Sequence, residues 1–215
     1  MELTGILRDI SLFIGIWVAI YGIDSWRREH TGKRQIELAE DTLALFYEAV
    51  DVIHYLRHPF SFDSETEDIE RVDSESEDAY QARKNASVLL KRYNEHQELF
   101  GRIHAMRYRF MVQIGKEEAK SFDELRRITI ELITSARRLS RLWARSHFRT
   151  EEQWTKHQQD MEKYESVFWE GLAEDDPINL RLVKVLLDIE RICYKTIEGK
   201  GTLHGWLNLH LGKHR

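Results

Sequence analysis

The sequence predicts an all-α protein in which an apolar N-terminal helix continues into an antiparallel bundle of about five helices. Charged residues make up 32% of the 215 residues and proline occurs only twice, a balance that is typical of long helices. Apolar residues recur at helical spacing along most of the chain, and no stretch alternates in the manner of a strand. We therefore divide the chain into an anchor helix (residues 1–28), a helical bundle (29–198) and a tail (199–215).

The first element is an uncharged apolar run from Ile10 to Ile23. A membrane span normally needs roughly 20 apolar residues, and a run of roughly 10–14 is also found in core helices and signal peptides. This run has no polar face, and apolar residues extend it to Leu3 and Trp26. No basic region precedes it and no small-residue cleavage site follows it, which argues against a signal peptide. We expect a single-pass membrane helix. The alternatives are a helix in the membrane plane or between subunits, and a soluble core helix.

Basic residues follow the apolar run directly. They are Arg27, Arg28, Lys33 and Arg34. The positive-inside rule places such a flank, and the bundle after it, in the cytoplasm, with the N-terminus outside. Near an anionic membrane each basic side chain gains on the order of 1 kcal/mol. We therefore predict that these four residues bind the membrane surface.

The bundle begins with a helix that continues from the anchor and carries two apolar seams. Pro59 is its stop signal. A second, long helix is predicted from about Ala79 to Ile114, with Gly115 as its C-terminal stop. The anchor and the first bundle helix together are expected to form one continuous rod.

Three further helices begin at recognisable capping signals. Ser121 and Thr150 each open a capping box, in which an acidic or amide side chain follows three residues later. Asp176 followed by Pro177 is typical of an N-cap with proline in the first helical position.

Two neighbouring stretches carry opposite charge. Residues 60–78 hold nine acidic residues against Arg71 and show no apolar period, which predicts a mobile loop. Residues 79–149 hold sixteen basic and seven acidic residues. Both stretches can be plain solvated surface, or the loop can screen a basic patch that binds an anionic partner such as lipid headgroups. The predicted patch consists of Arg126, Arg127, Arg137, Arg138, Arg141 and Arg145.

Few residues point to catalysis or to a bound metal. The single cysteine, Cys193, excludes an internal disulfide and is expected to be a buried apolar side chain. Asp51, His54 and His58 share one helix, which supplies too few ligands for a metal. The sequence contains no phosphate-binding loop and no glycine-rich dinucleotide turn, so we predict no cofactor. The net charge of −5 gives no preference for nucleic acid, and we do not expect it as a partner.

One loose pattern suggests an enzyme. The stretch from Arg141 to His147 fits the Arg-x5-His motif of the helical HEPN ribonucleases. The chain has ten histidines and many arginines, so such a match arises readily by chance. These two residues are therefore weak catalytic candidates, and we favour a protein that is not an enzyme.

The stretch SWRREHTGKRQIELAEDTLALFYEAVDVIHYLRHPF, with HAMRYRFM and DELRRI later in the chain, resembles a family of uncharacterised bacterial proteins. These have a short hydrophobic N-terminus, an acidic loop and a helical remainder. The resemblance implies a bacterial source, hence the inner membrane. No activity is known for this family, so no functional residues can be transferred to this chain.

These observations together predict a membrane-anchored interaction or scaffold protein. Its expected partners are membrane lipids, further copies of itself and other membrane-protein subunits. An accessory subunit of a larger membrane complex and a membrane-tethered HEPN-like ribonuclease are the alternatives.

Overall fold

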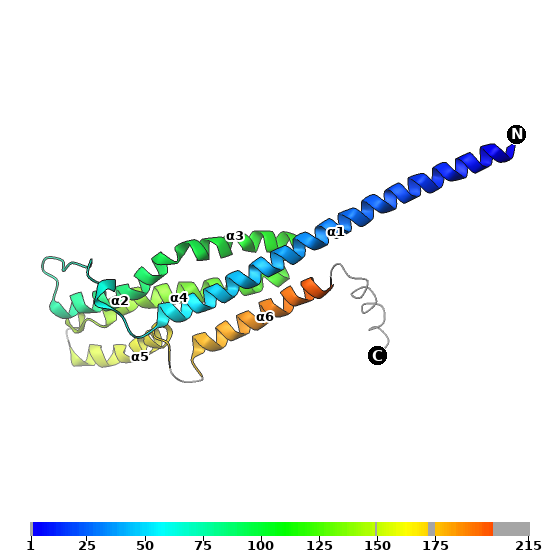
Figure 1. Cartoon of the computed structure of the whole chain (residues 1–215). Coiled ribbons are helices and arrows are strands. Elements are labelled where there is room, and N and C mark those ends of the chain that lie inside the picture. Colours follow the sequence, from blue (N-terminus) through cyan, green and yellow to red (C-terminus); the bar gives the residue numbers. More distant parts are fainter. Residues whose placement is uncertain (1, 149, 172–174, 200–215) are drawn as a thin grey trace. The chain divides into compact units, whose positions relative to one another are not determined.

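The computed structural model describes residues 2–148, 150–171 and 175–199, with the backbone alone for residues 2–11 and 147. This part of the chain consists of helices joined by loops and contains no strand, which confirms that the fold is all-α (Figure 1). Residues 42–191 form one compact unit, and the described residues within 2–41 and 192–199 belong to another. The helices are α1 (Glu2–Arg57), α2 (Glu77–Glu95), α3 (Gln97–Gln113), α4 (Lys120–Leu142), α5 (Glu151–Phe168) and α6 (Pro177–Gly199), with 3₁₀ turns at Asp63–Glu65, Glu117–Ala119 and Arg145–His147.

Helix α1 is continuous over 56 residues, as the sequence predicted for the anchor and the first bundle helix. It ends at Arg57 because the residue before Pro59 is driven out of the helical conformation. Among the described residues, no helix combines the length and the apolar character of a membrane span. Part of the predicted anchor, including Leu3 and Ile10, lies outside the described side chains.

The predicted single helix from Ala79 to Ile114 is wrong, because α2 and α3 are separated at His96. The His96 N–H donates to the Tyr93 carbonyl at 3.1 Å, so the acceptor lies three residues back, as in a 3₁₀ turn, and not four as in an α-helix. Nδ1 of the same histidine lies 3.1 Å from the Arg92 carbonyl oxygen, the usual helical acceptor for that N–H. The His96 side chain therefore replaces its own backbone in the hydrogen-bond ladder, and the helix breaks.

Two of the three predicted helix starts are confirmed. The Thr150 hydroxyl accepts a hydrogen bond from the Gln153 N–H at 3.2 Å, and Asp176 accepts from the N–H groups at the start of α6. The third is wrong: α4 already begins at Lys120, and Ser121 is buried within its first turn. The 3₁₀ turn at Glu117–Ala119 leads directly into α4, so this helix begins without a side-chain cap.

The unit of residues 42–191 is an antiparallel helical bundle. Helix α4 runs back along α2 and α3, and it packs against both α2 and α5 (Figure 1). An aromatic cluster lies in its core, where the Phe122 ring is 4.8 Å from Phe46 and 5.2 Å from Phe110. Helix α4 contributes most to this core because its apolar residues recur on one face. They are Phe122, Leu125, Ile128, Leu132, Ala136 and Leu139, all of them buried.

Candidate functional site

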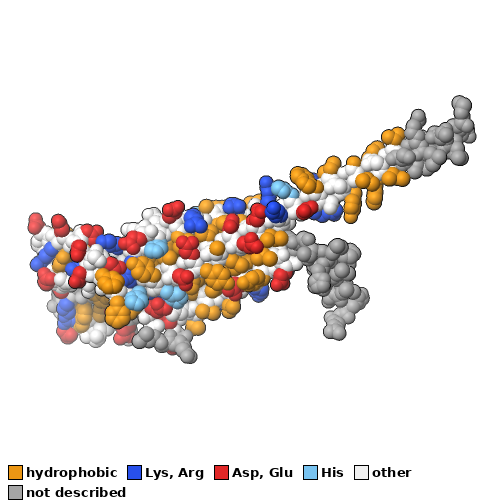
Figure 2. Space-filling model, in the orientation of Figure 1, with side chains coloured by type: hydrophobic (Ala, Val, Ile, Leu, Met, Phe, Trp, Pro, Cys, Tyr) orange, Lys and Arg blue, Asp and Glu red, His pale blue; other side chains and the backbone are white. Residues whose placement is uncertain are grey.

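The first described side chains of α1 include large exposed apolar residues (Figure 2), and their sequence positions cover all sides of the helix. Their exposed fractions range from 56% to 74%. A helix that is apolar on all sides is stable when lipid or protein surrounds it, so we expect lipid or protein to contact this surface. The residues are Leu12, Phe13, Ile14, Ile16, Trp17, Val18, Ile20, Tyr21, Ile23 and Trp26, and we call them the apolar segment.

Basic and aromatic residues adjoin the apolar segment. The four basic residues predicted from the sequence to bind a membrane surface, Arg27, Arg28, Lys33 and Arg34, are all exposed. Arg28 lies 3.7 Å from Asp24, but both side chains are more than 60% exposed, so this ion pair contributes little stability. The guanidinium of Arg28 also lies 6.0 Å from the ring of Tyr21. Aromatic and basic side chains at the end of an apolar helix are typical of a membrane interface.

The six arginines predicted as an anion-binding patch lie on α4 and just after it. Arg126, Arg127, Arg137, Arg138 and Arg141 all have exposed side chains, and their positions fall within about a third of the helix circumference. Arg127 pairs with Glu124 at 3.2 Å. Arg145 pairs with Glu151 and stacks over Trp154. Helix α4 thus carries one broad basic face, which we call the α4 arginine face.

The acidic loop is held against α2 by ion pairs, whereas the sequence predicted a mobile loop. Glu75 and Asp68 accept hydrogen bonds from Arg83 and Lys91 at 2.7 and 3.0 Å. The Arg83 hydrogen bond lowers the pKa of Glu75 to about 2. These ion pairs of Glu75 and Asp68 therefore run to α2, one of the basic helices of residues 79–149 over which the sequence hypothesis placed the loop.

A buried arginine, Arg92, joins the acidic loop to the end of α1. Arg92 is 2% exposed, and its guanidinium pairs with Glu65 at 2.6 Å. It also donates to the carbonyl oxygens of Tyr55, His58 and Phe60. The hydrogen bond from Arg92 lowers the pKa of Glu65. Arg92 thereby binds one carbonyl in the last turn of α1 and two in the segment that follows it, and so fixes the end of this helix.

A second buried arginine, Arg57, joins the end of α1 to the start of α6. Its side chain is fully buried and forms two hydrogen bonds to the Asp176 carboxylate, at 2.9 and 2.8 Å. It also donates to the carbonyls of Ser166, Val167 and Trp169 near the end of α5. Burial raises the pKa of Asp176, but the hydrogen bonds from Arg57 and from backbone N–H groups outweigh it and lower the pKa to about 2. This ion pair therefore fixes three helices and serves the fold.

The remaining polar candidates also have structural partners. His54 Nδ1 lies 2.6 Å from Glu170 Oε1, and His58 Nδ1 lies 3.3 Å from the Phe60 carbonyl. No group of three metal-ligating side chains occurs among the described residues. Cys193 is buried, as predicted, and burial raises the pKa of its thiol to about 12, so the thiol stays protonated.

Arg141 and His147 do not share a helix. Arg141 lies in the last turn of α4, whereas His147 lies in the following 3₁₀ turn, and its side chain is outside the described residues. Backbone geometry therefore gives the Arg-x5-His pattern no common helical face, and these two residues stay a weak hypothesis.

Comparison of this chain with protein families, with curated proteins and with solved structures finds no match. The resemblance to a bacterial family therefore stays an expectation, and the geometry of the chain carries the functional argument.

Sequence reasoning missed the buried arginines Arg57 and Arg92. A signal was present, since Arg57 follows Ile53 by one turn on the apolar face of α1, and Arg92 follows Val88 in the same way on α2. A charged residue on a buried face needs a partner, but nothing local indicates which one.

Proposed function

We propose that this protein is a membrane-tethered interaction protein whose apolar segment inserts into a lipid bilayer. The observation that carries the proposal is the exposure of ten large apolar side chains on all sides of one helix. Burying such a side chain gains about 1.5–3 kcal/mol, so transfer of the whole segment from water into lipid is strongly favourable.

The length of the segment fits insertion with help from its neighbours. At about 1.5 Å per residue, residues 12–26 cover roughly 22 Å of a hydrocarbon core that is roughly 30 Å thick. Leu3, Ile6, Leu7 and Ile10 precede the segment in the sequence and can cover the remainder. The basic flank after Trp26 then lies at the cytoplasmic headgroups of a bacterial inner membrane, and the bundle lies in the cytoplasm.

The bundle acts, in this proposal, by binding an anionic partner through the α4 arginine face. The buried cations Arg57 and Arg92 are committed to helix ends, which leaves the exposed arginines of α4 as the main basic surface. Clustered exposed cations attract an anionic surface, and salt weakens the attraction.

Vesicle flotation tests the tether. Full-length protein is mixed with protein-free vesicles of phosphatidylglycerol and phosphatidylethanolamine and centrifuged through a density gradient. The wild type should float, and the variant Ile16→Asp/Ile20→Asp should stay at the bottom. The matched control, Val183→Asp/Leu187→Asp, changes two α6 side chains of similar exposure and should float.

A wild type that fails to float, yet sediments with cell membranes, would contradict lipid insertion. That result would favour the alternative in which subunits of a membrane complex cover the apolar segment. Binding to polyglutamate tests the bundle separately: it should fall in Arg137→Glu/Arg138→Glu, and an unchanged affinity would reject the α4 arginine face as the docking surface.

A further inference from the structure

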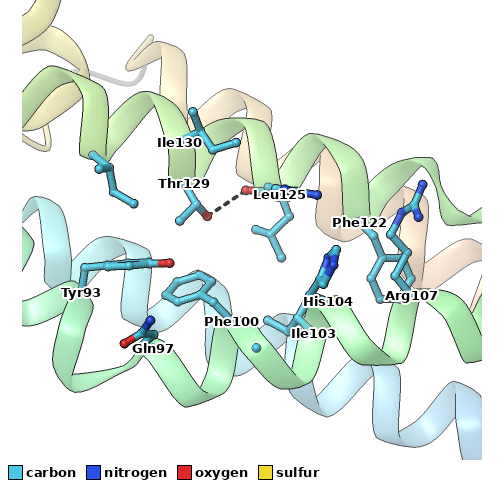
Figure 3. Close-up of a pocket in the computed structure, with 13 residues that line it drawn as sticks. Tyr93, Gln97, Phe100, Ile103, His104, Arg107, Phe122, Leu125, Thr129 and Ile130 are labelled. Carbon is cyan, nitrogen blue, oxygen red and sulfur yellow. Dashed lines mark hydrogen bonds between the residues drawn. The ribbon is translucent and has the colours of Figure 1, made fainter.

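A pocket of about 350 Å³ lies between α3 and α4 (Figure 3). Its floor is apolar and tightly packed, because its residues belong to the core of the bundle. Ile103, Phe122, Leu125 and Thr129 form this floor, and each is at most 6% exposed. The Thr129 hydroxyl donates to the Leu125 carbonyl at 2.9 Å, so it presents its methyl group rather than an unpaired polar atom.

Aromatic side chains form the walls of the pocket. The rings of Tyr93 and Phe100 stack with centroids 5.2 Å apart and planes inclined by 29°. Figure 3 shows Tyr93 and Gln97 at one end, His104, Arg107 and Phe122 at the other, and Phe100 between them. Ile130 adds an exposed aliphatic side chain from α4. Flat aromatic walls over an apolar floor are suited to a ring or a short hydrocarbon chain.

The charged residues of the pocket are all basic. Of its thirteen lining residues none is acidic, and two are arginines. Arg107 is neutralised by Asp123, whose carboxylate lies 2.8 Å from its Nε atom. Arg126 is exposed and forms no ion pair within the described part of the chain. It lies one helical turn from Phe122 and one turn from Ile130, so it adjoins the apolar surface along the length of the pocket.

We propose that this pocket binds a small monoanionic amphiphile. The apolar body, a flat aromatic ring system or a short hydrocarbon chain, lies against Tyr93, Phe100 and Phe122. The carboxylate or sulfonate group pairs with Arg126. The pocket volume is at the lower end of the roughly 300–1,000 Å³ typical of small-molecule sites, which limits the ligand to about the size of a substituted naphthalene.

Gly101 allows the pocket to be filled without disturbing the fold. It lines the pocket on α3, and a Cβ added there meets no atom within 4 Å. Gly101→Phe should therefore place a ring in the pocket. Gly101→Ala is the matched control, since it adds helix propensity and little volume.

The probe is 2-naphthalenesulfonate, titrated calorimetrically into full-length protein in lipid nanodiscs, with empty nanodiscs subtracted. We expect saturable binding that Gly101→Phe weakens at least tenfold and that Gly101→Ala leaves within twofold. Arg126→Gln should weaken the sulfonate about threefold or more without changing the affinity for neutral 2-naphthol. Arg137→Gln, an exposed arginine on the same helix outside the pocket, should have no effect.

Three results would overturn the proposal. The first is a wild type that does not bind the sulfonate at millimolar concentration. The second is binding that survives Gly101→Phe, which would place the probe elsewhere, for example on the apolar segment. The third is an equal affinity for 2-naphthylmethylammonium, because a pocket with a basic rim should reject a cation.

Discussion

Helix α1 has two apolar regions that differ in how their side chains are covered. In residues 42–57 buried side chains such as Phe46 and Ile53 alternate with exposed polar ones such as Glu48 and Asp51. In residues 12–26 every described side chain is exposed. The rest of the chain can cover a helix with one apolar stripe, whereas a helix that is apolar all round is stable only where lipid or protein surrounds it. The comparison shows that the pattern of apolar residues, rather than their number, separates the bundle part of α1 from the apolar segment.

The arginines of α1 show the same contrast. Arg57 is fully buried and receives its partners from residues more than a hundred positions away. Arg28 is largely exposed and pairs within its own helix with Asp24. Loss of its partner leaves a buried charge uncompensated and destabilises the fold, whereas loss of an exposed partner changes stability little.

The largest difference in stability is expected between two phenylalanine truncations, one in each apolar region of α1. Phe46→Ala should lower the free energy of unfolding by about 3–5 kcal/mol, since Phe46 is fully buried against Phe122. Phe13→Ala should change it by less than about 0.5 kcal/mol, because Phe13 is 74% exposed. Urea unfolding of the full-length protein, followed by circular dichroism, measures both. An equal loss of unfolding free energy in the two variants would contradict the difference in burial between the two regions.

Replacement of Arg57 and of Arg28 should differ in the same direction in its effect on stability. Arg57→Met should cost about 3–5 kcal/mol, because it leaves the buried Asp176 carboxylate without its cation. Arg28→Met should cost at most about 0.5 kcal/mol, as is usual for an exposed pair. The double variant Arg57→Met/Asp176→Asn should recover part of the loss, and a failure to recover would show that the carbonyl contacts of Arg57 matter more than the ion pair.

Acid should weaken the buried end of α1 through Asp176. Its pKa lies at about 2 in the folded chain, below the ordinary value of 3.8. A carboxyl with a lowered folded-state pKa stabilises the fold above its unfolded pKa and loses that contribution as the pH falls through the folded value. Asp176 should therefore contribute about 2 kcal/mol above pH 4, and this should disappear between pH 4 and pH 2.

The control for this pH dependence is Asp176→Asn, which keeps the N-cap of α6 and removes the titration. The pKa values of Glu65 and Glu75 are also lowered, so the difference between wild type and variant isolates Asp176. A difference that does not change between pH 2 and pH 7 would contradict the assigned role of the ion pair.

Helix starts were predictable where the signal was local. Thr150 and Asp176 cap their helices through hydrogen bonds to residues two or three positions away, which sequence spacing alone specifies. The continuity of α1 was predictable for the same reason, since no proline precedes Pro59. The break at His96 was missed because its side chain competes for the Arg92 carbonyl. The sequence gives no signal for this competition, since His96 lies in a regular apolar seam.

The sequence by itself determined that the protein is helical, where its charges lie and that residues 12–26 have no polar face, because these properties depend on composition and on neighbours within a few residues. Only the tertiary structure decided that Arg57 meets Asp176, that the acidic loop is fixed to α2 and that α3 and α4 enclose a pocket. Each of these pairings joins residues far apart in the chain, so the packing of the helices, rather than any local pattern, brings them together.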